Sequence, residues 1–161
     1  MSGYNVPMGP QPFALIMTGE IATQKGTIQM DSSTYQSHAI VNITIVDTGL
    51  NLDPNATDTA IAELSSSTET TPEVVILTET AKSSSVFRGQ IQLDNSATPV
   101  SDGLLQVQNG DMISAAYFDV DDGLGGSGSV YDYAFVDDSP PIIYGVQITN
   151  VRFNRATVKW E

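Results

Sequence analysis

The sequence predicts an all-β protein that folds as an antiparallel β-sandwich. Runs of four to eight residues rich in Val, Ile, Thr, Tyr and Phe recur between clusters of Gly, Pro, Asp, Asn and Ser, and helical periodicity is nearly absent. Without helices to make parallel crossovers, such strands pair antiparallel and pack in two layers, as in the immunoglobulin-like sandwich. A closed β-barrel is the alternative.

Each expected strand is bounded by turn residues. In chain order, the strands are Phe13–Thr18, Thr27–Met30, His38–Val46, Thr59–Ser65, Glu73–Glu79, Val86–Leu93, Met112–Phe118, Gly128–Val136, Ile142–Asn150 and Ala156–Trp160.

Alternation along three of these strands predicts one face toward the core. In the strand His38–Val46, one face has Ala39, Val41, Ile43 and Ile45 and the other has Ile40, Asn42, Thr44 and Val46. In Glu73–Glu79, the faces are Val75, Leu77 and Glu79 against Val74, Ile76 and Thr78. In Val86–Leu93, they are Phe87, Gly89 and Ile91 against Arg88, Gln90 and Gln92.

Proline and charge predict three segments. Pro7, Pro10 and Pro12 lead into one strand, so residues 1–24 are expected to be the terminal strand of a preceding β domain. Residues 25–138 hold the complete sandwich. The stretch from Asp137 to Pro141 reads as a stiff linker, because paired prolines favour extended backbone. Residues 139–161 are therefore the linker and the first strands of a further domain.

The composition argues against several classes of function. Nineteen acidic and six basic residues give a net charge of −13, which repels nucleic acid and anionic membrane surfaces. No apolar run approaches the roughly 20 residues needed to cross a bilayer. The absence of cysteine excludes disulfides and cysteine-ligated zinc. The first residues lack the features of a signal peptide, so any export signal is expected upstream.

Three stretches resemble known families. The run VPMGPQPFALIMTG at 6–19 resembles the last strand of the domain that follows the catalytic region in secreted subtilisin-like serine proteases. The segments VDTGLNLDPNATD, LTETAKSSSVFRGQIQL and DGLLQVQNGDMISAAYFDVDDG are similar to a repeated module of bacterial and archaeal surface proteins and protease tails. The tail PPIIYGVQITNVRFNRATVKWE is similar to the first two strands of a fibronectin type III domain.

The resemblance implies a slice of a secreted, extracellular or cell-surface protein. Its expected partners are an upstream catalytic domain and the neighbouring β domains of the same chain. The motif around a subtilisin-like catalytic serine is missing here, so this piece is not expected to be an enzyme, although its parent is expected to be a serine protease or a surface protein.

Acidic loops are the candidate metal sites. The first loop has the sequence FDVDDGLGGSG, and its expected metal ligands are Asp119, Asp121 and Asp122. The second loop has the expected ligands Asp47, Asn51 and Asp53, together with Asn55 and Asp58. Hard oxygen ligands on a flexible loop suit calcium, which takes six to eight oxygens. Bound calcium would also relieve the self-repulsion of the charge. The alternative is that Asp, Asn and Gly form solvated turns. Asp137 and Asp138 could close a further site beside the linker.

Other polar residues are expected to have structural roles. His38 starts a strand and reads as a partly exposed structural histidine rather than a catalytic base. Glu79 and Arg88 flank a turn and are expected to form a salt bridge. Asn42 and Asn55 match the glycosylation pattern, which means little in a bacterial protein.

The function expected from these observations is a non-catalytic spacer, stabilising or interaction domain that binds calcium. The alternative is a module that binds carbohydrate or a protein substrate, for which an exposed aromatic strip would be the sign. Candidates are Tyr117, Tyr131, Tyr133 and Tyr144, but Tyr131 and Tyr133 share a face with Phe135 that a core explains equally well.

Apolar residues near the two ends predict a further contact. Both end segments are expected to pack onto the sandwich or to make a homodimer with another copy of the chain. The residues concerned are Phe13, Leu15, Ile148, Val158 and Trp160.

Overall fold

The computed structural model describes residues 24–96 and 102–161, and these form an all-β fold with no α-helix. One 3-10 turn, η1 (Thr48–Leu50), follows the third strand. The strands are β1 (Thr27–Met30), β2 (Thr34–Tyr35), β3 (Ile40–Val46), β4 (Thr59–Ser66), β5 (Glu73–Glu79), β6 (Val86–Asp94), β7 (Leu104–Gln106), β8 (Met112–Asp119), β9 (Gly128–Val136), β10 (Gln147–Arg152) and β11 (Arg155–Lys159).

The strands expected between Thr27 and Trp160 are found, with two differences. The strand expected over Ile142–Asn150 begins only at Gln147, because residues 137–146 form an exposed linker. Two short strands, β2 and β7, are additional. The strand expected over Phe13–Thr18 lies outside the described residues.

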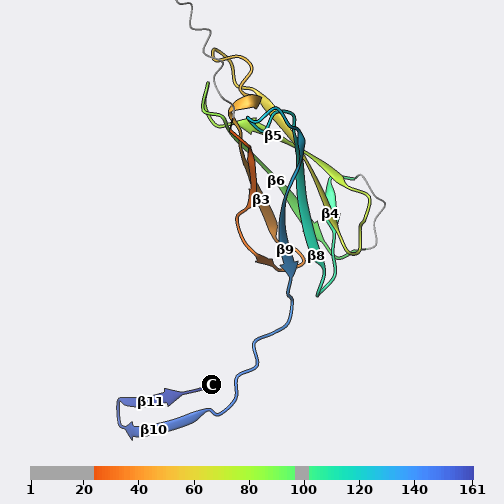
Figure 1. Ribbon diagram of the computed structural model, residues 1–161. Coiled ribbons are helices and arrows are strands. Elements are labelled where there is room, and N and C mark those ends of the chain that lie inside the picture. Colours follow the sequence, from red (N-terminus) through yellow and green to blue (C-terminus); the bar gives the residue numbers. More distant parts are fainter. Residues whose placement is uncertain (1–23, 97–101) are drawn as a thin grey trace, which may run out of the picture.

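The large sheet curls into a sandwich (Figure 1). Its strand order is β1-β3-β6-β5-β4-β8-β9-β2, with β7 beside β6. The sheet turns between β6 and β5, which are joined by only two residue pairs, so β1, β3 and β6 form one layer and β5, β4, β8 and β9 form the other. The path is open, with β1 at one end and β2 at the other, so the alternative of a closed barrel is not formed. The sheet is mixed rather than purely antiparallel, since β2 pairs with β9 and β7 pairs with β6 in parallel.

The core lies between the layers, and the predicted alternation is confirmed. In β3 every second residue is fully buried while its neighbours face outward. The same holds along β5 and β6, where Leu77 and Phe87 are fully buried and Ile76 and Arg88 are exposed. The largest fully buried apolar side chains are Phe87, Ile43, Ile45, Leu64, Leu77, Leu93, Leu105 and Ile113.

Beyond Asp137 the chain leaves the sandwich and ends in a separate two-stranded hairpin, β10–β11 (Figure 1). Ile148 pairs with Val158 in this hairpin, and every residue of both strands is exposed. Ile148, Val158 and Trp160 remain 62%, 48% and 64% exposed, so they do not pack onto the sandwich. The alternative contact with another copy of the chain stays a prediction, and Phe13 and Leu15 lie outside the described residues. A hairpin of two strands is marginally stable alone.

Removing residues 140–161 should therefore leave the sandwich intact. We expect its melting temperature, followed by far-UV circular dichroism, to change by no more than about 2 °C, because surface changes usually cost within about 0.5 kcal/mol. A drop of roughly 10 °C or more would show that the hairpin contributes to the core.

Candidate functional site

Two features of the sandwich are candidates for function: an acidic cluster at one end and an apolar face on one layer. The acidic cluster joins residues from both loops in which the sequence predicted calcium ligands. Asp47 follows β3 and Asp119 ends β8, and each is only 2% exposed. The start of β1 closes the cluster, since the backbone N–H of Gly26 donates to Asp119 Oδ2 at 2.9 Å.

Each carboxylate is tied to its own loop. Asp47 caps η1 by accepting from the backbone N–H of Gly49 at 2.7 Å. Asp119 Oδ1 accepts from the backbone N–H of Asp121 at 3.1 Å. Burial first, and then the negative charges of Asp119 and Asp121, raise the pKa of Asp47. The hydrogen bond from Gly49 and the nearby Tyr117 hydroxyl lower this pKa.

Tyr117 points into this cluster, and the sequence analysis did not connect it with the acidic loops. It is 3% exposed, and its hydroxyl makes no hydrogen bond of acceptable distance and angle. The hydroxyl and Asp47 Oδ2 lie 1.6 and 2.9 Å from the point that a Cβ on Gly26 would occupy. Gly26 is needed here, because any side chain would fill this space. Burial first, and then Asp47 and Asp119, raise the pKa of Tyr117.

The other predicted ligands make turns. Asp121 Oδ1 accepts from the backbone N–H of Gly123 at 3.0 Å. Asp122 Oδ1 accepts from those of Leu124 and Gly126 at 2.8 and 2.9 Å, which lowers the pKa of Asp122.

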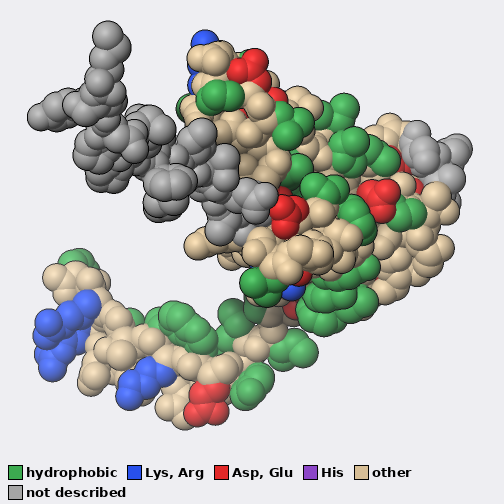
Figure 2. Space-filling model, turned by 45° about the horizontal axis from the view of Figure 1, so that its top comes forward, with side chains coloured by type: hydrophobic (Ala, Val, Ile, Leu, Met, Phe, Trp, Pro, Cys, Tyr) green, Lys and Arg blue, Asp and Glu red, His purple; other side chains and the backbone are tan. Residues whose placement is uncertain are grey.

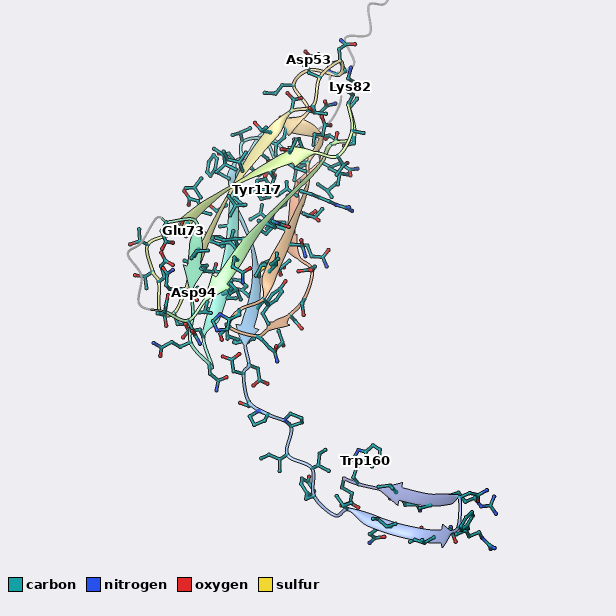
Figure 3. The ribbon with its side chains drawn as sticks, turned by 180° about the vertical axis from the view of Figure 1, so that it is seen from behind. Asp53, Glu73, Lys82, Asp94, Tyr117 and Trp160 are labelled. Atoms are coloured by element: carbon teal, nitrogen blue, oxygen red, sulfur yellow. The ribbon has the colours of Figure 1, made fainter. Side chains whose placement is uncertain are left out.

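The loop that carries Asn51 and Asp53 is held by its own hydrogen bonds. Asn51 donates to Ser83 Oγ at 3.1 Å, and Asp53 accepts from the backbone N–H of Asn55 at 2.9 Å. Figure 3 places Asp53 at the tip of its loop, near Lys82, with Tyr117 further down in the sandwich. Across residues 24–96 and 102–161, no three His, Asp or Glu side chains converge closely enough to hold a metal ion by themselves. The calcium site stays a prediction.

His38 lies against Asp94, with 3.6 Å between Nδ1 and Oδ1, and its side chain is 66% exposed. Ser96 donates to the other oxygen of Asp94 rather than to His38. In a Ser-His-Asp triad the serine hydroxyl bonds to the histidine, so these three residues have a different arrangement.

The predicted salt bridge between Glu79 and Arg88 is wrong. Thr78, not Glu79, stands opposite Arg88, so Glu79 points inward and Arg88 outward. Glu79 is 3% exposed and accepts from the backbone N–H groups of Ser85 and Asp58 at 2.8 and 3.2 Å. It therefore holds together the β5–β6 turn and the loop before β4.

The second candidate is the solvent-side surface of β5, β4, β8 and β9, which we call the outer face. Tyr131, Tyr133 and Phe135 are 53%, 51% and 55% exposed, so the interpretation of these aromatics as core is wrong. Their partners on β8 are Ala116, Ser114 and Met112, which point the same way. Further exposed apolar residues of this face are Ile61, Val74, Ile76 and Phe118.

The outer face is almost free of charge. Glu63 is the one charged residue at the outward positions of these four strands, in a chain with 19 acidic residues. The opposite surface of the sandwich is mostly polar, with Thr27, Gln29, Asn42, Thr44, Arg88, Gln90 and Gln92 at outward positions. In Figure 2, hydrophobic side chains gather in patches on the surface of the sandwich turned to the viewer.

A hollow of about 430 Å³ opens in the outer face. It forms because β4 pairs with β8 only from Glu63 to Ser66, and the two strands part toward Thr59. Its walls include Ile61, Glu63 and Phe118, which face outward, and Leu50, which packs against the core. The outer face therefore carries a row of aromatic side chains and this hollow.

Comparison with protein-family models and with curated proteins finds no match for this chain. Among the described residues no helix is long and apolar enough to cross a membrane.

Proposed function

We propose that residues 25–138 form a non-catalytic interaction domain that binds another protein through the outer face. The sequence resemblance favours a place in the accessory region of a secreted subtilisin-like protease or a cell-surface protein. The observation that carries the proposal is the row of exposed aromatic side chains, Tyr131, Tyr133 and Phe135, on a face with one charged residue.

Physical chemistry supports a protein partner. The centres of protein interfaces are enriched in Tyr, Phe and Met and depleted of charge. An exposed apolar patch of this kind marks an interaction site when the rest of the surface is polar. The opposite surface of the same sandwich is mostly polar, with Ile40 and Val46 as half-exposed exceptions, so the contrast is not a property of the fold.

One observation favours carbohydrate as the second candidate ligand. The rings of Tyr131 and Tyr133 are nearly parallel, at 7°, with centroids 6.2 Å apart. These rings stack on one another, and both are half exposed, so the pair presents aromatic surface against which a sugar ring of a polysaccharide can pack.

Replacing single aromatic residues of the outer face tests the proposal. The wild-type chain is immobilised, proteins from the source culture are captured on it, and the Kd of each purified partner is measured by calorimetry. Tyr133→Ala and Phe135→Ala should each weaken binding by about 30-fold, the size expected for aromatic hot spots. The controls Gln29→Ala and Gln90→Ala, on the polar surface, should stay within about 2-fold.

The outcomes separate the candidates. A partner whose Kd is the same for the aromatic variants and the wild type would contradict the proposal. Retention of the wild type on insoluble chitin or cellulose, lost in Tyr131→Ala and Tyr133→Ala, would favour the carbohydrate candidate.

A further inference from the structure

The acidic end of the sandwich contains more buried negative charge than its protein partners compensate. Asp47 and Asp119 come from the ends of two strands, and both are 2% exposed. The ion pair found among the described residues joins His38 and Asp94, so neither of these carboxylates has a basic partner there. Burying a charge without a counter-charge is costly, and proteins usually pair such groups or place a metal ion between them.

Tyr117 is an independent sign of a missing group. Its hydroxyl is buried beside Asp47 Oδ2, but it makes no hydrogen bond of acceptable distance and angle to Asp47 or to another described group. Buried polar atoms without a partner are rare and call for an explanation such as an ion or a water molecule. A cation bound to the two carboxylates, with the hydroxyl beside it, explains the hydroxyl and the paired charges together.

We propose that a calcium ion binds between Asp47 and Asp119 next to the Tyr117 hydroxyl. The oxygen atoms and the absence of cysteine favour a hard cation over zinc, iron or copper. Two carboxylates are fewer than calcium requires, so the remaining ligands are backbone carbonyl groups and water, which calcium accepts because its geometry is flexible.

Bound calcium would join three separate parts of the chain. Gly26 precedes β1, Asp47 follows β3 and Asp119 ends β8. The ion would therefore fix the start of the sandwich to both layers. This role does not depend on the outer face, so a result that contradicts one proposal leaves the other unaffected.

Thermal unfolding of the full chain in calcium chloride and in EGTA tests the site. A ligand held by the native state alone raises stability as its concentration exceeds Kd. At free calcium about 100 times Kd, we expect the melting temperature to rise by roughly 10 °C. Asp47→Asn and Asp119→Asn should each reduce the calcium affinity at least about 10-fold and so remove about half of this rise or more, since each removes one charged ligand. Glu63→Gln, which removes the same charge from the outer face, should keep it.

Terbium luminescence gives a second readout that does not depend on the stability of the variants. Terbium substitutes for calcium and emits when a nearby tyrosine is excited. The wild type should show this emission and lose it on addition of calcium. Tyr117→Phe should keep the fold, because only the hydroxyl is removed, and should reduce the rise in melting temperature with calcium. Melting rather than terbium emission measures this variant, since the change also removes the tyrosine beside the ion.

Three results would overturn the proposal. The first is a melting temperature that is equal in calcium and in EGTA. The second is a calcium response that persists in the double variant Asp47→Asn and Asp119→Asn, which would place the ion elsewhere. The third is an equal rise with magnesium chloride at the same concentration, which would show that the site does not select calcium.

Discussion

Replacing Phe87 with alanine should lower the free energy of unfolding by about 3–5 kcal/mol. Phe87 is fully buried in β6, where it stands opposite Ile45 of β3 and Glu79 of β5. It lies where β5 joins β6 through only two residue pairs, so its ring fills the seam at which the sheet turns from one layer to the other. The loss combines the transfer free energy of the ring with the cost of the cavity that remains.

Guanidinium denaturation followed by far-UV circular dichroism measures this loss. The tryptophan is unsuitable as a reporter, because Trp160 lies beside the hairpin strands, outside the sandwich. The matched control is Phe135→Ala, the same change on the outer face, which should cost within about 0.5 kcal/mol. A loss in Phe135→Ala equal to that in Phe87→Ala would mean that another copy of the chain covers the outer face in solution.

The strands and much of the core were predictable because the information is local. A period of two along β3, β5 and β6 separates inward from outward residues, and the structure follows that pattern. Turn residues between the apolar runs set the strand limits. The two-residue β2 and the three-residue β7 were missed because they are too short to show alternation.

The orientation of β9 was not predictable from its own residues. Both faces of this strand carry apolar side chains, with Val130, Ala134 and Val136 on one and the aromatic row on the other. If side-chain size alone decided which face is buried, the aromatic residues would lie in the core. Antiparallel pairing with β8 decides otherwise, since Ala134 stands opposite the fully buried Ile113 and Tyr133 opposite Ser114.

The acidic cluster could be predicted only in part. Its carboxylates belong to loops that are far apart in sequence, and each loop also contains turn-forming acids such as Asp53 and Asp122. Only the fold shows that Asp47 and Asp119 meet. Tyr117 gave no signal as a member of the cluster. The sequence made it a candidate for an exposed aromatic strip, which is wrong because its side chain is only 3% exposed.

Replacing Glu79 with alanine should lower the free energy of unfolding by about 2–4 kcal/mol. The change leaves two backbone N–H groups, of Asp58 and Ser85, without the carboxylate that they bond, and an unpaired buried donor costs about 1–3 kcal/mol. Arg88→Ala, on the exposed side of β6, should cost within about 0.5 kcal/mol. An exposed salt bridge would instead give each variant the same small loss, about 0–1 kcal/mol. Urea denaturation of both single variants and of the double variant decides between the two roles of Glu79. If Glu79 forms an ion pair with Arg88, the two losses of unfolding free energy are not additive. If Glu79 bonds the two loops instead, the losses add.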